Sequence, residues 1–160
     1  MPAPPLTPLA TAVLHVGSPE RVLAVGCGRG DAALFLAREF PQARVRGVDR
    51  SEELVREATA RVGLDPEGRV AFKAGRPSSL PYPDDFFDLV AQIDSRPAPT
   101  EIARVLRPGG HLIVTAERRP RHPLEFDPLR LGRKLGRRGF ELVEAEVAGD
   151  GSFFVGRLRE

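Results

Sequence analysis

Three glycines at alternate positions follow a short apolar segment near the start of the chain. The segment is 22–25, and the glycines are Gly26, Gly28 and Gly30. Glycine accepts the backbone angles of a tight turn and has no Cβ to keep a ligand away from the main chain. Residues 31–40, with apolar side chains at helical spacing, follow at once. A turn between a strand and a helix presents backbone N–H groups to a ligand, so this stretch predicts a binding turn.

An acidic residue, Asp49, follows the second strand-like segment of the chain, 44–48. An acid at the end of the second strand of a parallel sheet can accept hydrogen bonds from both ribose hydroxyls of a nucleoside-containing cofactor. The alternative for Asp49 is a helix-capping or turn acid, and the alternative for the glycines is plain packing. The spacing G-x-G-x-G is not the dinucleotide pattern G-x-G-x-x-G, which disfavours a nicotinamide-dependent oxidoreductase.

Strand-like and helix-like segments alternate along the chain, and the last two strand-like segments are joined at 148–151 by a tight turn. This pattern predicts an α/β fold with a parallel sheet and an antiparallel C-terminal hairpin. Residues 1–8 are expected to form a proline-rich arm, and 9–160 a single domain. The predicted strands are 22–25, 44–48, 70–74, 86–93, 111–116, 140–147 and 152–158. The predicted helices begin at Pro8 after the candidate cap Thr7, at Asp31, after the cap Ser51, at Thr100 and after the cap Asp127. Residues 107–110 are a predicted turn.

Four segments in order resemble the class I S-adenosylmethionine-dependent methyltransferases, most closely the small-molecule branch that includes the ubiquinone and menaquinone methyltransferases. They are residues 22–31, 47–51, 80–90 and 101–110. The resemblance implies a Rossmann-like seven-stranded, mostly parallel sheet of order 3-2-1-4-5-7-6, with helices on both faces. In such sheets, ligands lie at the carboxyl ends of the strands, near the point where the strand order reverses.

The resemblance also implies the cofactor and its contacts. S-adenosylmethionine carries its own reactive methyl group, so the protein mainly has to hold an acceptor in line with it. Asp49 would bind the ribose diol, and the glycines would pass close to the methionine and ribose. Asp94, after the fourth strand, is the candidate general base, with an exposed loop acid as the alternative. The residues expected to contact the cofactor are Gly26, Cys27, Gly28, Gly30, Asp49, Arg50, Gly75, Arg76 and Gln92.

This chain departs from the family pattern in three places. Ala24 stands where the family usually has an acid that holds the methionine amine, and Asp31 is a candidate substitute. Arg76 stands where the family often has an Asp that binds the adenine amine, a hydrogen bond that Arg cannot accept. The segment between the fourth strand and the next helix, which usually helps cover the acceptor, is short. A homodimer that completes the pocket is therefore a candidate assembly.

Three functions are compatible with these features. The first is a methyltransferase that acts on a small molecule by in-line attack on the sulfonium methyl. The second, favoured by Ala24 and Arg76, is a non-catalytic member of the fold that serves in interaction or regulation. The third is an RNA methyltransferase that uses the basic stretch from Arg118 to Arg138. The alternative for that stretch is a solvated helix face.

The amino-acid composition further limits the classes of protein to which this chain can belong. The chain has 160 residues and a net charge of only +2, so charge alone does not make it a polyanion binder. The single cysteine, Cys27, excludes an internal disulfide and favours a reducing cytoplasm. The histidines show no metal-ligand spacing, and no segment reaches the length of a membrane span. The absence of Asn and the 16 prolines fit a thermophile, although a GC-rich genome gives a similar bias.

Overall fold

The structure is a computed structural model that describes residues 6–117 and 127–160. Its strands form one seven-stranded sheet in the order β3-β2-β1-β4-β5-β7-β6, which confirms the expected topology. Neighbouring strands from β3 to β5 run parallel, and β7 is antiparallel to both β5 and β6. The strands are β1 (Arg21–Val25), β2 (Arg44–Asp49), β3 (Val70–Ala74), β4 (Phe87–Ile93), β5 (Leu106–Ala116), β6 (Phe140–Ala148) and β7 (Gly151–Leu158).

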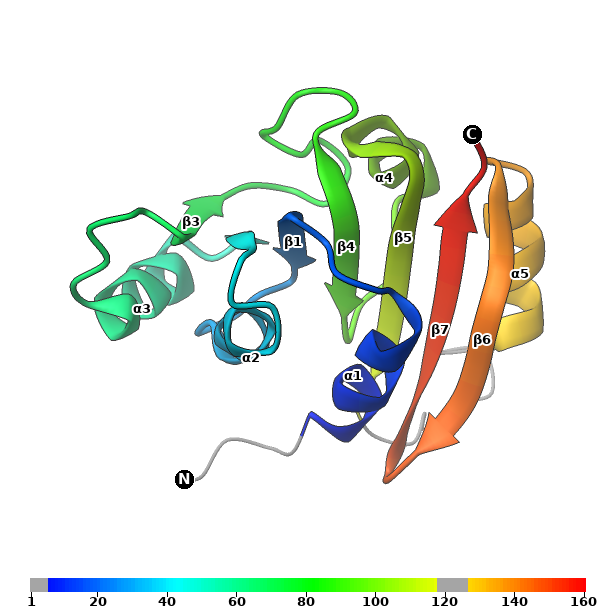
Figure 1. Cartoon of the computed structure of the whole chain (residues 1–160), viewed down its shortest axis with the longest axis horizontal. Coiled ribbons are helices and arrows are strands. Elements are labelled where there is room, and N and C mark those ends of the chain that lie inside the picture. Colours follow the sequence, from blue (N-terminus) through cyan, green and yellow to red (C-terminus); the bar gives the residue numbers. More distant parts are fainter. Residues whose placement is uncertain (1–5, 118–126) are drawn as a thin grey trace.

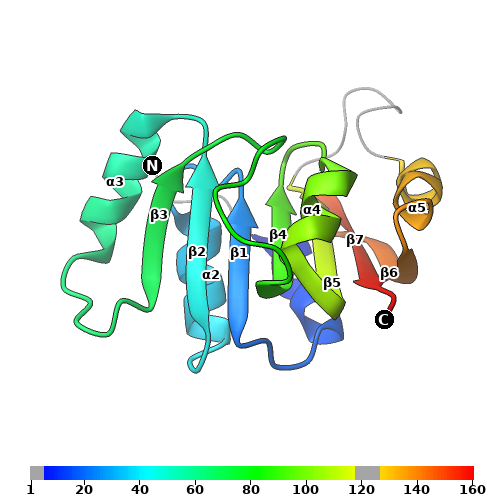
Figure 2. The ribbon, with the colours of Figure 1, turned by 90° about the horizontal axis from the view of Figure 1, so that it is seen from above.

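Helices cover both faces of this sheet, as expected (Figures 1 and 2). Helices α1 and α2 pack on one face, α4 and α5 pack on the other, and α3 flanks the edge strand β3. They are α1 (Thr7–Ala12), α2 (Asp31–Glu39), α3 (Glu52–Val62), α4 (Pro99–Val105) and α5 (Pro128–Gly136), with a 3₁₀ turn, η1 (Val13–His15), after α1. Within residues 6–117 and 127–160, no helix combines the length and the hydropathy that crossing a bilayer requires.

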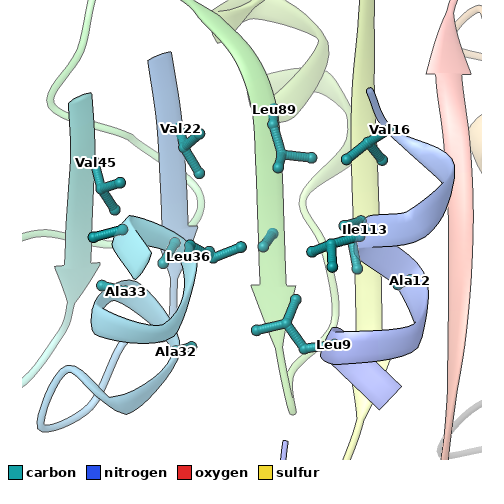
Figure 3. Packing of buried hydrophobic residues seen from close by; sticks show 14 of the residues in the cluster. Leu9, Ala12, Val16, Val22, Ala32, Ala33, Leu36, Val45, Leu89 and Ile113 are labelled. Atoms are coloured by element: carbon teal, nitrogen blue, oxygen red, sulfur yellow. The ribbon is translucent and has the colours of Figure 1, made fainter. Parts of the chain in front are cut away.

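The apolar cluster on the α1 and α2 face fixes the position of the glycine turn. Leu9 of α1 and Leu36 of α2 lie fully buried against strand residues such as Val22 and Leu89 (Figure 3). Burying one such side chain contributes about 1.5–3 kcal/mol. Because α2 and β1 belong to the same cluster, the turn that joins them is held at both ends.

A second cluster lies on the opposite face, under α4 and α5. Phe87, Ile102 and Leu135 are fully buried there. The segment between β3 and β4 contributes Leu80 and Tyr82, and the Tyr82 ring packs edge-on against Phe87 with 5.0 Å between ring centroids. This loop covers a part of the same sheet face that α4 and α5 leave uncovered (Figure 2).

Two predicted helix caps are confirmed. Ser51 Oγ accepts the N–H of Leu54 at 3.1 Å, so it caps α3. Asp127 Oδ1 accepts the N–H of Leu129 at 3.0 Å and so caps α5. At the start of α1, Leu6 occupies the capping position without a side-chain bond, so the expectation that Thr7 caps this helix was wrong.

Most predicted strands and helices begin and end within one or two residues of the observed ones, and larger differences occur at two places. The expected turn at 107–110 is instead part of β5, because Leu106 pairs with Phe87 and His111 with Leu89, which leaves the intervening residues as a bulge. Gly109, with φ +85°, allows this bulge. Of the expected arm at 1–8, residues 1–5 lie outside the described residues, while Thr7 and Pro8 belong to α1.

The C-terminal hairpin depends on a glycine at the start of β7. A Cβ at Gly151 would overlap the backbone carbonyl oxygen of Ala116 at the end of β5. We therefore expect Gly151→Ala to lower the free energy of unfolding by about 3 kcal/mol, at the upper end of the usual cost of overpacking. Urea unfolding followed by circular dichroism measures this loss.

Gly132 in α5 provides the matched control. A Cβ there would lie 3.8 Å from the Phe154 ring, which is an ordinary contact. Gly132→Ala should stabilise the protein by about 0.5–1 kcal/mol, because it lowers the entropy of the unfolded chain and favours the helix. Equal free energies for the two variants would contradict this account of the hairpin.

Candidate active site

The Asp49 carboxylate lies at the centre of the candidate site, at the carboxyl end of β2. Its Oδ2 accepts the N–H of Gly28 at 3.0 Å, and its Oδ1 accepts the N–H of Ser51 at 3.0 Å. The glycine turn therefore orients the carboxylate on one side, and the start of α3 orients it on the other. Each carboxylate oxygen accepts more than one hydrogen bond, so Asp49 retains capacity for a ribose diol.

The three glycines of the turn have different roles. All have positive φ, +73° at Gly26, +52° at Gly28 and +95° at Gly30. A Cβ on Gly26 would lie 3.0 Å from Ile93 O, and one on Gly30 would lie 3.1 Å from the Phe72 ring. At Gly28, no described atom lies within 4 Å of that position. Packing therefore explains the outer glycines, whereas Gly28 borders open space through which a ligand can approach the backbone.

The backbone of Cys27 holds the glycine turn through two hydrogen bonds. Its N–H donates to Val48 O at 3.1 Å, and its carbonyl accepts the N–H of Gly30 at 2.8 Å. Burial, with a smaller contribution from the charge of Asp49, raises the pKa of the Cys27 thiol to about 12. The thiol is therefore protonated at neutral pH and is not a nucleophile. Contact between Cys27 and a cofactor stays a prediction.

Three other predicted residues meet beside Asp49. Arg50, Gly75 and Arg76 line one hollow at the carboxyl ends of β2 and β3, and the Gly75 N–H donates to Asp49 O at 2.9 Å. Both arginines are exposed. A guanidinium plane can stack on an aromatic ring, which is a way for Arg76 to contact an adenine without accepting a hydrogen bond.

Gln92 lies on β4, which pairs with β1 on the side opposite β2, and it stands opposite Val25, the residue before the glycine turn. It is 0% exposed, and its Nε2 donates to Ser95 Oγ at 2.6 Å. Its buried Oε1 has no hydrogen-bond partner among the described residues. A buried acceptor without a partner costs about 1–3 kcal/mol, so a donor from a bound ligand fits this position.

Two carboxyls lie at the ends of β4 and β5. Asp94, the predicted base, is exposed with φ +49°, and its Oδ1 accepts the Glu117 N–H at 2.7 Å. Burial raises the pKa of Glu117 to about 7; the Thr115 side chain opposes this rise, and the charge of Asp94 adds to it. A carboxyl that titrates near neutrality is suited to general base catalysis. Sequence reasoning missed Glu117, although an acid directly after a predicted strand, as at Asp49 and Asp94, was a usable signal.

Asp31 has a different environment from the one expected. Its Oδ1 lies 2.8 Å from Arg61 Nη1, and it lines a separate hollow between α1 and α2. Ala24, whose missing acid it was expected to replace, is fully buried in β1. The structure therefore does not support Asp31 as a substitute for that acid.

The sheet order and the acid held at the glycine turn define the fold class as that of the S-adenosylmethionine-dependent methyltransferases. A methyltransferase structure of this kind from Aquifex aeolicus superposes with a TM-score of 0.79 and 22% sequence identity, covering 96% of this chain and 90% of that one. At this identity, the similarity shows the fold alone.

The family follows from the sequence comparison. Residues 22–110 match the family described as methyltransferase domain, and the chain belongs to this family. A fatty-acid O-methyltransferase from Mycolicibacterium smegmatis is 37% identical over 112 residues, which are 66% of this chain and 39% of that protein. The ubiquinone/menaquinone biosynthesis C-methyltransferase UbiE of Geobacter sulfurreducens is 35% identical over 113 residues, 65% of this chain and 44% of that protein. The chain thus spans less than half the length of these relatives. The predicted family is confirmed, and S-adenosylmethionine is supported as its cofactor.

The raised pKa of Glu117 predicts a pH-dependent stability. Between its ordinary value of 4.5 and about 7, the folded protein holds a proton that the unfolded chain releases, so the stability contributed by this group falls as pH rises. Glu117→Gln removes this dependence. Between pH 5 and pH 8, we expect the free energy of unfolding of the variant to rise relative to that of the parent. The rise is about 1 kcal/mol once solvent screening of this half-buried group is included.

Urea unfolding of both proteins at each pH measures this difference. Glu67→Gln, at an exposed position, is the control and should leave the pH profile unchanged. Parallel profiles for the parent and Glu117→Gln would show that Glu117 is not perturbed by burial.

Proposed function

We propose that the chain binds S-adenosylmethionine at the glycine turn and transfers the methyl group to a small-molecule acceptor. The observation that carries this proposal is the Asp49 carboxylate, held by the N–H groups of Gly28 and Ser51 beside the open space at Gly28. When bound, the cofactor supplies an electrophilic sulfonium methyl group. The family to which residues 22–110 belong supports methyl transfer as the activity.

The residues of the site have distinct roles in this proposal. Gly28 lets the cofactor approach the main chain, and Asp49 accepts hydrogen bonds from the ribose hydroxyls. Arg76 stacks on the adenine, and the unpartnered Oε1 of Gln92 accepts a hydrogen bond from a ligand donor. An acceptor nucleophile beyond the end of β4 releases its proton to Asp94 or, at neutral pH, to Glu117.

The acceptor is proposed to be a small molecule because of the named relatives. One acts on a fatty acid, and the other functions in ubiquinone and menaquinone biosynthesis. The RNA alternative depended on the stretch from Arg118 to Arg138, of which 118–126 lies outside the described residues. A salt-sensitive gel shift with RNA would favour that alternative over a small-molecule acceptor.

Three further proposals concern the protein as a whole. The single cysteine supports a reducing, cytoplasmic location, and the lack of Asn supports a thermophilic source. The short segment between β4 and α4 supports a homodimer in which the second copy covers the acceptor. A melting temperature in the mesophile range would argue against the thermophile, and a monomeric mass in solution against the dimer.

The cofactor proposal predicts a specific loss of affinity in Asp49→Asn. The variant keeps the shape of the side chain but replaces one carboxylate oxygen with an NH2 group, which cannot accept a hydrogen bond from a ribose hydroxyl. We expect the affinity for S-adenosylhomocysteine to fall about 10- to 100-fold, the value of one charge-assisted hydrogen bond. Isothermal titration calorimetry measures this, with S-adenosylmethionine as a second ligand and NAD as the negative control.

Asp31→Asn is the matched control, since Asp31 directly follows the turn but pairs with Arg61. It should leave the cofactor affinity within about twofold of the parent. An equal loss in both variants would instead show that Asp31 replaces the acid missing at Ala24. If the parent protein binds neither S-adenosyl compound, the non-catalytic alternative becomes the better description.

A further inference from the structure

A further hollow opens between the segment after β4 and helix α5. Figure 2 shows that this segment and α5 both lie on the α4 side of the sheet. Its apolar lining includes Val114 of β5 and Leu131 of α5. Its remaining lining is mostly cationic and comes from two separate elements. The basic residues that line it are Arg96, Arg130, Arg133, Lys134 and Arg137. We call this hollow the basic cleft.

The basic cleft adjoins the cofactor side of the molecule through Ser95. Ser95 lines the cleft, and its Oγ accepts the hydrogen bond from Gln92 Nε2 at 2.6 Å. The same Oγ lies 3.3 Å from the position of a Cβ on Gly26, in the glycine turn. A molecule in the cleft can therefore extend past Ser95 toward the turn at which the cofactor is proposed to bind.

The charge of the cleft is unbalanced. Among the described residues, none of its five basic side chains forms an ion pair, and the acid that lines it is Asp127. The Asp127 Oδ1 is already engaged by the N–H groups of Leu129 and Arg130 at the start of α5. Like charges gathered in a concave site produce a strong positive potential, which favours an anionic ligand. The planar guanidinium groups match the oxygen geometry of a carboxylate or a phosphate.

We propose that the methyl acceptor carries an anionic group, a carboxylate or a phosphate, and that the basic cleft binds this group. This inference rests on the proposed methyltransferase function. The apolar lining would contact the carbon skeleton, and the far end of the acceptor would face the glycine turn past Ser95. A nucleic acid fits the cleft less well, because none of its lining residues is aromatic and no platform for base stacking is present.

The experiment uses the full chain saturated with S-adenosylhomocysteine, titrated in low salt with octanoate and, separately, with octyl phosphate. Octanamide is the neutral control, inorganic phosphate is the headgroup control, and a single-stranded RNA 12-mer is the macromolecular control. We expect at least one of the two anionic probes to bind more than tenfold tighter than octanamide and inorganic phosphate. The stronger of the two identifies the anion as carboxylate or phosphate.

The double variant Arg133→Gln/Arg137→Gln should lose at least tenfold of the affinity for that probe while it binds S-adenosylhomocysteine as the parent does. Arg138→Gln, an exposed position that does not line the cleft, is the matched control and should change neither affinity.

Failure of the parent to bind S-adenosylhomocysteine would count against the proposed function, independently of the cleft. The cleft assignment would be overturned in either of two cases, both with normal cofactor binding. In the first, the anionic probes bind no tighter than octanamide or inorganic phosphate, and in the second, the double variant binds the probe as tightly as the parent does. RNA binding tighter than either probe, lost in the double variant, would replace it with a nucleic-acid site.

Discussion

The hydrogen bond from the Gly28 N–H to the Asp49 carboxylate depends on the register of the first two strands. Val25 pairs with Val48, and the N–H groups of Gly26 and Cys27 both donate to Val48 O. The pairing of β1 and β2 thus continues into the glycine turn and places this turn next to Asp49, which follows Val48. A shift of one residue would turn Asp49 to the opposite face of the sheet and separate it from the turn. The candidate site therefore requires that the sheet first pairs in this register.

The same packing gives a physical reason for the absence of an acid at Ala24. Ala24 pairs with Gly47, and a Cβ at Gly47 would lie 2.5 Å from the Phe72 ring and 3.1 Å from Cys27 Cβ. Small residues on β1 and β2 thus leave room for Phe72 and Cys27 to pack beneath the turn. Ala24 itself is 0% exposed, so a carboxylate there would be buried without a partner in this arrangement, at a high cost in free energy. In the proposed function the cofactor is therefore bound through other groups, and Asp49 and Gln92 are the candidates that the structure offers.

Much of this arrangement could be predicted because it depends on local signals. The unbroken apolar segment at 22–25, the capping residues Ser51 and Asp127 and the alternation of strands and helices all act within a few residues, while the resemblance to the methyltransferases supplied the cofactor. Long-range contacts decided what was missed. The turn at 107–110 became a bulge because β4 pairs with residues on both sides of it. The pairing of Asp31 with Arg61, the burial of Glu117 and the position of Arg96 beside α5 each depend on contacts between segments that are far apart in the chain. No local pattern reports such contacts, although the basic residues of α5 themselves were visible in the sequence.

The residues predicted to contact the cofactor lie inside the family match, whereas most of the basic cleft lies outside it. Every residue predicted to contact the cofactor lies within residues 22–110, and these offer mainly backbone groups, glycine-made space and one oriented carboxylate. Four of the five basic side chains of the cleft belong to α5 or to the residue that follows it, outside that match. Backbone geometry of this kind depends on the fold and tolerates little change. Among the described side chains of α5, Leu135 is the fully buried one, so the exposed side chains of this helix can change without disturbing the core. The cofactor half of such a molecule is therefore constrained by packing, whereas the charge on α5 can be matched to a particular acceptor.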